Sequence, residues 1–273
     1  MRESLHKKAQ SFEGGHCRIG KDLLNPGHIS FGKQLLDLGQ IEDALLQYTL
    51  ALRFGRNEAK RFVFFVPLHP MTTIIIILIT AVVSILCFYG RLNASALVFN
   101  AYQVWHRRQW YRMLSYGVVH AGWGHLIFNM LTLYFFGPVV EQYFTSAFGT
   151  SAGLLLYAVL YVSAIAVSTI GDLIKNRDNI YSNAVGASGA VSAILFASIL
   201  FEPKMGIYIF MIPIPVPGYI FAPLYLLYCW YMAKRNMDNI GHTAHFWGAV
   251  YGLIFPLACK PDIVVHFLSQ LGL

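Results

Sequence analysis

Six long stretches without a single charged residue dominate the sequence after residue 61. They cover residues 62–90, 113–140, 142–171, 179–201, 205–233 and 239–259. Each is longer than the roughly 20 residues with which an α-helix crosses about 30 Å of hydrocarbon. We therefore predict an all-α polytopic membrane protein with a bundle of six transmembrane helices, embedded in a lipid bilayer.

Charge is concentrated at the start of the chain. Residues 1–61 hold 17 of the 33 charged residues, so the other 212 residues share 16, and only 12% of the whole chain is charged. A soluble domain carries about 25% charged residues. This distribution excludes an intrinsically disordered chain, a disulfide scaffold and a soluble nucleic-acid-binding domain. The net charge of +7 is accordingly no indication of a nucleic-acid partner.

We predict three parts: an N-terminal tail at 1–61, a six-helix core at 62–260 and a short C-terminal tail at 261–273. Leucines recur at roughly helical spacing in residues 28–58, which predicts two short amphipathic helices there. Residues 1–61 show no apolar segment of a secretory signal. Ten of the 20 basic residues lie in this tail, so the positive-inside rule places it in the cytoplasm. With an even number of spans, the C-terminus is expected there too.

Two segments between the spans have unusual composition. Residues 92–106 are apolar but too short to cross a bilayer, and the cluster of aromatic and basic residues at 106–112 follows them. Such a mixture suits the headgroup zone, so we expect this loop to lie in the membrane surface. The three prolines in residues 213–217 cannot continue a helix in lipid, so the fifth span is expected over about 218–233.

Polar side chains inside the spans mark candidate functional residues, because an unsatisfied polar group in hydrocarbon is costly. His125 and Asn129 are four residues apart and share one helical face. His120 is five residues before His125, about 140° away on a regular helix, and is expected at the start of the span, where glycines loosen the backbone.

A serine at the start of the fourth span has glycines on both sides. Ser188 follows Gly186 by two residues and precedes Gly189. A hydroxyl at a helix start lies near unpaired backbone N–H groups, which gives a nucleophile and donors for an oxyanion in one place. The alternative is that these small residues only allow helices to pack closely.

The sixth span offers a candidate general base. His245 lies one turn before Gly248 and Gly252, which form a face that permits close approach of another helix. A histidine has a suitable ordinary pKa for proton transfer, although a buried packing role is the alternative. Contact of this face with the small residues around Ser188 would place His245 beside Ser188.

Other catalytic or metal chemistries do not fit the spacing. The chain has no His-Glu-x-x-His motif, no Gly-x-Ser-x-Gly elbow after a strand, and no pair of acidic residues within a span. The four cysteines, Cys17, Cys87, Cys229 and Cys259, show no Cys-x-x-Cys spacing and no histidine placed in sequence to complete a zinc site. We therefore expect no disulfide, metal or cofactor, and a Ser–His pair remains.

Three motifs together resemble the rhomboid family of intramembrane serine proteases, over about residues 70–260. They are His120-x4-His125-x3-Asn129, Gly186-x-Ser188-Gly189 and Ala244-His245-x2-Gly248-x3-Gly252. The resemblance implies a rhomboid-like six-helix bundle with a membrane-embedded first loop. It also implies a dyad with Ser188 as nucleophile and His245 as base, and transmembrane proteins as substrates.

The same resemblance assigns supporting residues. His125, Asn129 and the backbone N–H of Ser188 match the oxyanion hole, and His120 matches a histidine that supports the start of the second span. Arg112 and Glu141 match a pair that is expected to be structural.

Two positions depart from the family pattern. Tyr111 stands where Trp is usual, and Ser192 stands where many members carry an aromatic residue next to the catalytic histidine. His245 is then held less firmly, or is packed by Phe246 or Phe196 instead. A rhomboid-like module that binds transmembrane segments without cutting them is the alternative function. A transporter is less favoured, because the chain has neither charge pairs within the spans nor inverted repeats. The sequence indicates neither an oligomeric state nor the organelle.

Overall fold

The computed structural model describes residues 71–208, 214–235 and 241–273. The predicted N-terminal tail at 1–61, with its two amphipathic helices, and the first part of the first span lie outside the described residues. The unit that begins at residue 69 is mainly helical. Its longer helices are α6 (Met71–Phe88), α10 (Trp123–Phe148), α11 (Thr150–Ser168), α13 (Ser188–Phe201), α14 (Gly218–Arg235) and α15 (His242–Cys259).

Short elements connect these helices. Between α6 and α10 lie α7 (Ala94–Leu97), β1 (Phe99–Asn100), α8 (Ala101–Arg107), α9 (Arg112–Ser115) and η2 (Tyr116–Val118). The later connections and the C-terminus contain α12 (Ile170–Asn176), β2 (Asn183–Ala184), β3 (Gly206–Ile207), β4 (Val216–Pro217) and α16 (Ile263–Leu271). Two antiparallel strand pairs form, β1 with β2 and β3 with β4.

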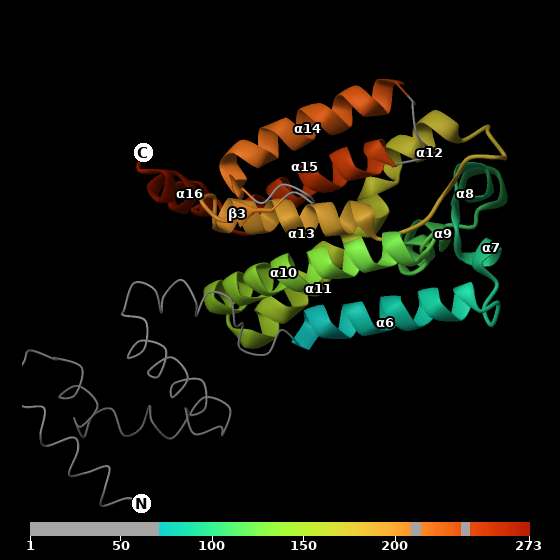
Figure 1. The fold of residues 1–273 in the computed structure, drawn as a ribbon, viewed down its shortest axis with the longest axis horizontal. Coiled ribbons are helices and arrows are strands. Elements are labelled where there is room, and N and C mark those ends of the chain that lie inside the picture. The colour runs from blue at the N-terminus through green and yellow to red at the C-terminus, as the bar shows by residue number, and fades with distance from the viewer. Residues whose placement is uncertain (1–70, 209–213, 236–240) are drawn as a thin grey trace, which may run out of the picture. The chain divides into compact units, whose positions relative to one another are not determined.

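Helix α13 lies at the centre of the bundle. Figure 1 shows it between α10 and α11 on one side and α14 and α15 on the other, and it contacts all four. Every residue of α13 after Ser188 is buried. A helix that is apolar on all sides requires such a position, since it has no face suited to water.

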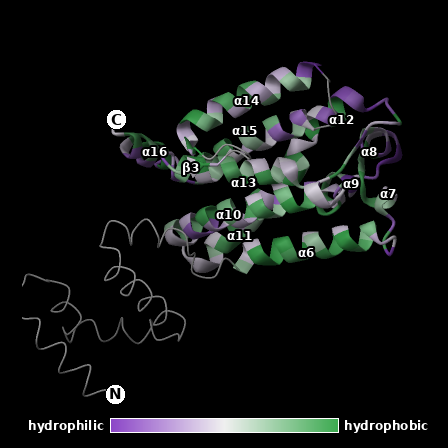
Figure 2. Cartoon of the chain, viewed as in Figure 1, coloured by the Kyte–Doolittle hydropathy of each residue, from purple (hydrophilic) through white to green (hydrophobic). Residues whose placement is uncertain are grey.

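Helix α6 has the burial pattern of a lipid-facing helix. Its buried residues are Thr73, Thr80 and Ser84, whereas large apolar side chains such as Ile75 and Leu78 are 50% and 59% exposed. Figure 2 shows the helix hydrophobic along most of its length. A water-soluble protein would bury these apolar groups and expose the polar ones, so this helix faces hydrocarbon.

Each of the six charge-free stretches holds all or most of one of the longer helices, and α14 begins at Gly218, as the prolines before it predict. Two helices extend further than the stretches do: α10 continues through Glu141 to Phe148, and α14 continues to Arg235. Three helical segments are long and apolar enough to cross a bilayer: α6, α10, and α11 continued by α12. A fourth is counted if α15 and α16, which bend by 115°, form one span. Six crossings therefore stay a prediction, as does the position of the termini.

The short length of α13 has a physical reason. Its 14 residues extend only about 21 Å at 1.5 Å per residue. Because its neighbours cover it on all sides, it has no need for the 20 apolar residues of a helix in contact with lipid.

The expected pairing of Arg112 with Glu141 is wrong. The buried Arg112 guanidinium donates through Nη1 to the carbonyl oxygens of Ser95, at 2.9 Å, and Val98, at 2.8 Å, so it holds its own loop together. Glu141 instead accepts hydrogen bonds from the backbone N–H groups of Thr72 and Thr73 and from the Thr73 hydroxyl. A carboxylate is favourable there, because the first turn of a helix has unpaired N–H groups.

The loop between α6 and α10 carries the aromatic side chains expected of a segment at the membrane surface. Trp105, Trp110 and Tyr111 are each about half exposed. The Tyr111 hydroxyl donates to the carbonyl of Ala96 at 3.1 Å, so tyrosine anchors this loop in place of the usual tryptophan. The depth of the loop in the bilayer stays a prediction.

Candidate active site

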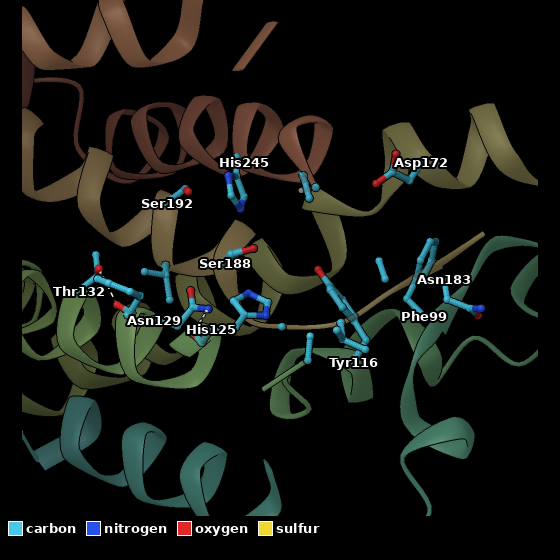
Figure 3. A pocket seen from close by; sticks show the side chains of 18 of the residues that line it. Phe99, Tyr116, His125, Asn129, Thr132, Asp172, Asn183, Ser188, Ser192 and His245 are labelled. Carbon is cyan, nitrogen blue, oxygen red and sulfur yellow. Dashed lines mark hydrogen bonds between the residues drawn. The ribbon is translucent and has the colours of Figure 1, made fainter. Parts of the chain in front are cut away.

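A cavity of about 760 Å³ lies among α10, α13 and α15. Ser188, His245, His125 and Asn129 all line it. Figure 3 shows the Ser188 side chain between the rings of His245, from α15, and His125, from α10. The fold therefore brings together four residues that the sequence analysis singled out in three separate spans.

The backbone before Ser188 requires glycine. Gly186 has φ +102°, a conformation that other residues rarely adopt, and a Cβ atom there would collide with the His125 ring. Its N–H donates to the carbonyl of Tyr116 at 3.0 Å. The Tyr116 hydroxyl bonds in turn to the carbonyl of Ile165 at 2.8 Å. Hydrogen bonds thus connect the turn before Ser188 to η2, and η2 to α11.

The loop that precedes Ser188 is also paired with the loop after α6. Residues Phe99 and Asn100 of β1 pair with Ala184 and Asn183 of β2. The Asn100 amide donates to the Asn183 side chain at 3.0 Å and to the carbonyl of Ile180 at 2.9 Å. This pairing orients the extended segment that leads into the helix of the serine.

An exposed hydrogen-bonded pair, His106 with Asp178, joins the same two regions further out. His106 Nε2 lies 3.0 Å from Asp178 Oδ1, and Arg177 Nε lies 3.5 Å from the other carboxylate oxygen. The hydrogen bond with His106 lowers the pKa of Asp178, with a smaller contribution from the charge of Arg177. At such an exposed position the pair orients the loop more than it stabilises the fold.

Helix α15 contacts α13 through glycines, as the sequence predicted. A Cβ on Gly248 would overlap the carbonyl oxygen of Gly189, and one on Gly252 would overlap that of Ala193. A Cβ on Gly189 would meet the Ser168 side chain. This close approach brings His245, one turn before Gly248, to the same cavity as Ser188.

Within the described residues, Ser188 Oγ forms no hydrogen bond of 3.5 Å or less with His245. Hydrogen bonds between a nucleophile and its base are often long without substrate and shorten when substrate binds. What the two share here is the wall of one cavity, on adjoining helices.

The two residues expected to form the oxyanion hole are connected. The Asn129 amide donates to the carbonyl of His125, one turn earlier, at 2.9 Å, and both side chains line the cavity. An amide nitrogen has two N–H groups, so the second is available to another acceptor.

His120 is buried next to the cavity without lining it. Its Nδ1 lies 2.9 Å from Ser84 Oγ, which donates its own proton to the carbonyl of Val118 at 2.8 Å. Because a hydroxyl has one proton, Nδ1 of His120 must carry the proton of its bond to Ser84. The ring centroids of His120 and His125 are 5.0 Å apart at 69°, so His120 packs edge-on against His125.

Tyr225 of α14 is a site residue that the sequence analysis missed. It lines the cavity, and its hydroxyl lies 3.1 Å from Ser192 Oγ, at the position where an aromatic residue is usual. The Phe196 ring contacts the Tyr225 ring at a centroid distance of 5.6 Å, and the His245 ring contacts the His242 ring at 6.1 Å. A tyrosine within an apolar stretch was the available signal, since its hydroxyl needs a partner.

Three possible metal ligands also meet beside the cavity. One ligand atom each of Cys229, His242 and His245 lies within 4.8 Å of the others. The expectation that no histidine accompanies a cysteine was based on spacing along the chain, and α14 and α15 bring these residues together in space.

Comparison with known proteins places these features in one family. The family model of the Rhomboid domain matches residues 107–261. RHOMBOID-like protein 12, mitochondrial, of Arabidopsis thaliana is 30% identical over 142 residues, which are 50% of this chain and 42% of that protein. Putative rhomboid protease YdcA of Bacillus subtilis is 23% identical over 217 residues, 76% of this chain and 96% of that protein.

Rhomboid protease GluP of Bacillus subtilis is 29% identical over 151 residues, 52% of this chain and 25% of that protein. The matches thus span less than half of the plant protein and a quarter of GluP, but nearly all of YdcA. The Rhomboid domain match covers more than half of the chain, and the protein belongs to the rhomboid family.

Proposed function

We propose that this protein is an intramembrane serine endopeptidase that cuts transmembrane segments of membrane proteins with a Ser188–His245 dyad. The observation that carries the proposal is the meeting of Ser188, His245, His125 and Asn129 at one cavity. Two of the similar proteins are named rhomboid proteases, one of them as putative. Packing alone would not require a hydroxyl, two imidazoles and an amide to converge there.

The chemistry follows from the groups around Ser188. His245 takes the hydroxyl proton as Ser188 Oγ attacks the carbonyl carbon of the scissile peptide bond. Negative charge then develops on the carbonyl oxygen. The amide of Asn129, the ring of His125 and the backbone N–H of Ser188, at the first residue of α13, are the donors that stabilise it.

Collapse of this tetrahedral intermediate releases the amine product, which takes the proton from His245. The acyl group stays on Ser188 until a water molecule, activated by His245, attacks it and releases the carboxylic acid. An acidic residue as the third member of the catalytic group is not required if surrounding groups orient the imidazole. The edge-on contact with the His242 ring, at a centroid distance of 6.1 Å, is one such constraint.

The substrate class follows from the position of the cavity in a membrane protein. A transmembrane helix hides its carbonyl groups in hydrogen bonds to residues four positions later. A segment must therefore unwind locally before Ser188 can attack it. We propose that substrates are transmembrane segments with residues that destabilise a helix near the cleaved bond.

Labelling with a fluorophosphonate probe tests the dyad. Detergent-purified protein should incorporate one probe at Ser188, identified by mass spectrometry, and Ser188→Ala and His245→Ala should incorporate none. Ser198→Ala is the matched control, because that serine is buried in the same helix and its hydroxyl bonds to the carbonyl of Leu195 at 2.7 Å. If the wild-type protein is not labelled but still binds transmembrane peptides, the non-proteolytic module would be favoured instead.

A further inference from the structure

A buried cysteine and two histidines form a cluster of possible metal ligands, and the proposed peptide cleavage requires no metal there. Cys229 is fully buried on α14, and His242 is 4% exposed at the first residue of α15. His245, half-buried, is the third member. The two histidines are three residues apart, so they share one face of α15, and that face meets α14.

The spacing of the ligand atoms suits a small metal ion. One atom from each residue, the Cys229 sulfur and one ring nitrogen from each histidine, lies within 4.8 Å of the other two. Zn–N bonds of about 2.0–2.1 Å and a Zn–S bond of about 2.3 Å place the ligand atoms of a tetrahedral site roughly 3.3–3.8 Å apart. Small rotations of the side chains that move the ligand atoms by about 1 Å would therefore close the cluster around an ion.

The donor set indicates which ion. Thiolate and imidazole together favour Zn²⁺ among the common divalent cations, whereas Mg²⁺ and Ca²⁺ prefer oxygen ligands. The Tyr228 ring packs edge-on against His242, at a centroid distance of 5.4 Å and 85°, and limits how that ring can turn. His245 also lines the cavity, which provides a path for the ion and room for a fourth ligand.

We propose that Cys229, His242 and His245 bind Zn²⁺ and that the bound ion inhibits the enzyme. On binding, Cys229 loses its thiol proton to solvent and its sulfur bonds to the ion. A ring nitrogen of His245 gives its lone pair to the same ion. If this is the nitrogen that faces Ser188, it can no longer accept the hydroxyl proton. If it is the other, the neutral ring carries its own proton on the nitrogen that faces Ser188, which again cannot accept one. The inhibitory half of this inference rests on the proposed function, and the binding half does not.

The binding half is tested without any catalysis. Co²⁺ is titrated into the detergent-purified Ser188→Ala protein, and the thiolate-to-cobalt charge-transfer absorption is recorded. We expect one Co²⁺ per chain, displaced by Zn²⁺, with the band abolished in Cys229→Ala and binding weakened at least tenfold in His242→Ala. Cys259→Ala is the matched control, because it removes a half-buried cysteine of α15 outside the cluster. A band of equal strength in Cys229→Ala, or no band at all, would overturn the site.

The inhibitory half is tested on protein that retains Ser188. For each variant, the rate of substrate cleavage with Zn²⁺ is divided by its own rate with a chelator, so that differences in intrinsic activity cancel. We expect at least a tenfold reduction by Zn²⁺ in the wild-type protein and in Cys259→Ala, reversed by the chelator, and less than twofold in Cys229→Ala. Equal reduction in Cys229→Ala would overturn inhibition through this site. Absence of cleavage even with the chelator would count against the proposed protease function. The Co²⁺ titration would still test whether the metal site exists.

Discussion

Gly248 of α15 lies directly against the carbonyl group of Gly189, the residue that follows the proposed nucleophile. No side chain separates the two helices at this point. The distance between the proposed base and the proposed nucleophile therefore depends on a contact between two backbones. This relationship makes the glycine as important for function as the residues that carry the chemistry.

We predict that Gly248→Ala lowers the cleavage rate about 100-fold. The added methyl group overlaps the Gly189 carbonyl, so α15 must move outward and take His245 with it. A misplacement of about 1 Å in a catalytic group can cost a factor of this size, and overpacking costs about 1–3 kcal/mol of stability. Cleavage rates and thermal unfolding in detergent measure both effects. Gly124→Ala is the control, since a Cβ there meets no atom within 4 Å; equal rates in the two variants would show that this contact does not position the site.

Gly186→Ala is predicted to abolish labelling of Ser188 by a fluorophosphonate. The new Cβ collides with the His125 ring, and the backbone at φ +102° is unfavourable for alanine. Gly149→Ala separates the two causes, because Gly149 also has a positive φ, +82°, but open space around it. We expect both variants to unfold at lower temperature and only Gly186→Ala to lose labelling. Retention of labelling in Gly186→Ala would mean that the His125 ring is not required at its observed position.

The sequence predicted the main helices and the residues at the cavity because a charged or strongly polar side chain is energetically costly in the hydrocarbon of a bilayer. Charge-free stretches indicate where helices lie, and the polar side chains left within them, such as Ser188 and His245, need a reason to be there. The proline run predicted that α14 begins at Gly218, because proline removes a backbone donor and restricts the chain. These are local properties of the chain.

The missed or wrong features depend on how distant segments meet. Nothing in the local pattern around Arg112 or Glu141 indicates that one binds loop carbonyls and the other the first turn of α6. The cluster at Cys229 likewise requires the packing of α14 on α15. The number of membrane crossings is also hard to predict from the sequence, since the central α13 is shorter than a lipid-facing helix.

Asn129→Ala is predicted to lower kcat about 100- to 1,000-fold with little change in KM, the usual cost of removing one oxyanion donor. The reason is that its amide is expected to bind the oxygen only when negative charge develops on it. Thr132→Ala is the matched control, because Thr132 lines the same cavity but its hydroxyl donates to the carbonyl of Phe128 at 2.8 Å. Steady-state kinetics on a reporter substrate measure both constants. A rise in KM without loss of kcat would assign Asn129 to substrate binding instead.

The separate partners of Arg112 and Glu141 predict additive effects on stability. We expect Arg112→Gln and Glu141→Gln each to destabilise the protein, by about 1–3 kcal/mol, because each leaves buried hydrogen-bonding groups unpaired. Residues that share no partner usually add within about 0.5 kcal/mol in the double variant. Denaturant unfolding in mixed micelles of the four proteins gives the coupling energy. In a direct buried ion pair, either single substitution would already remove the interaction, at about 3–5 kcal/mol, and the second would add little. A coupling of that size would restore the ion pair and contradict the arrangement in which one residue holds the loop and the other caps α6.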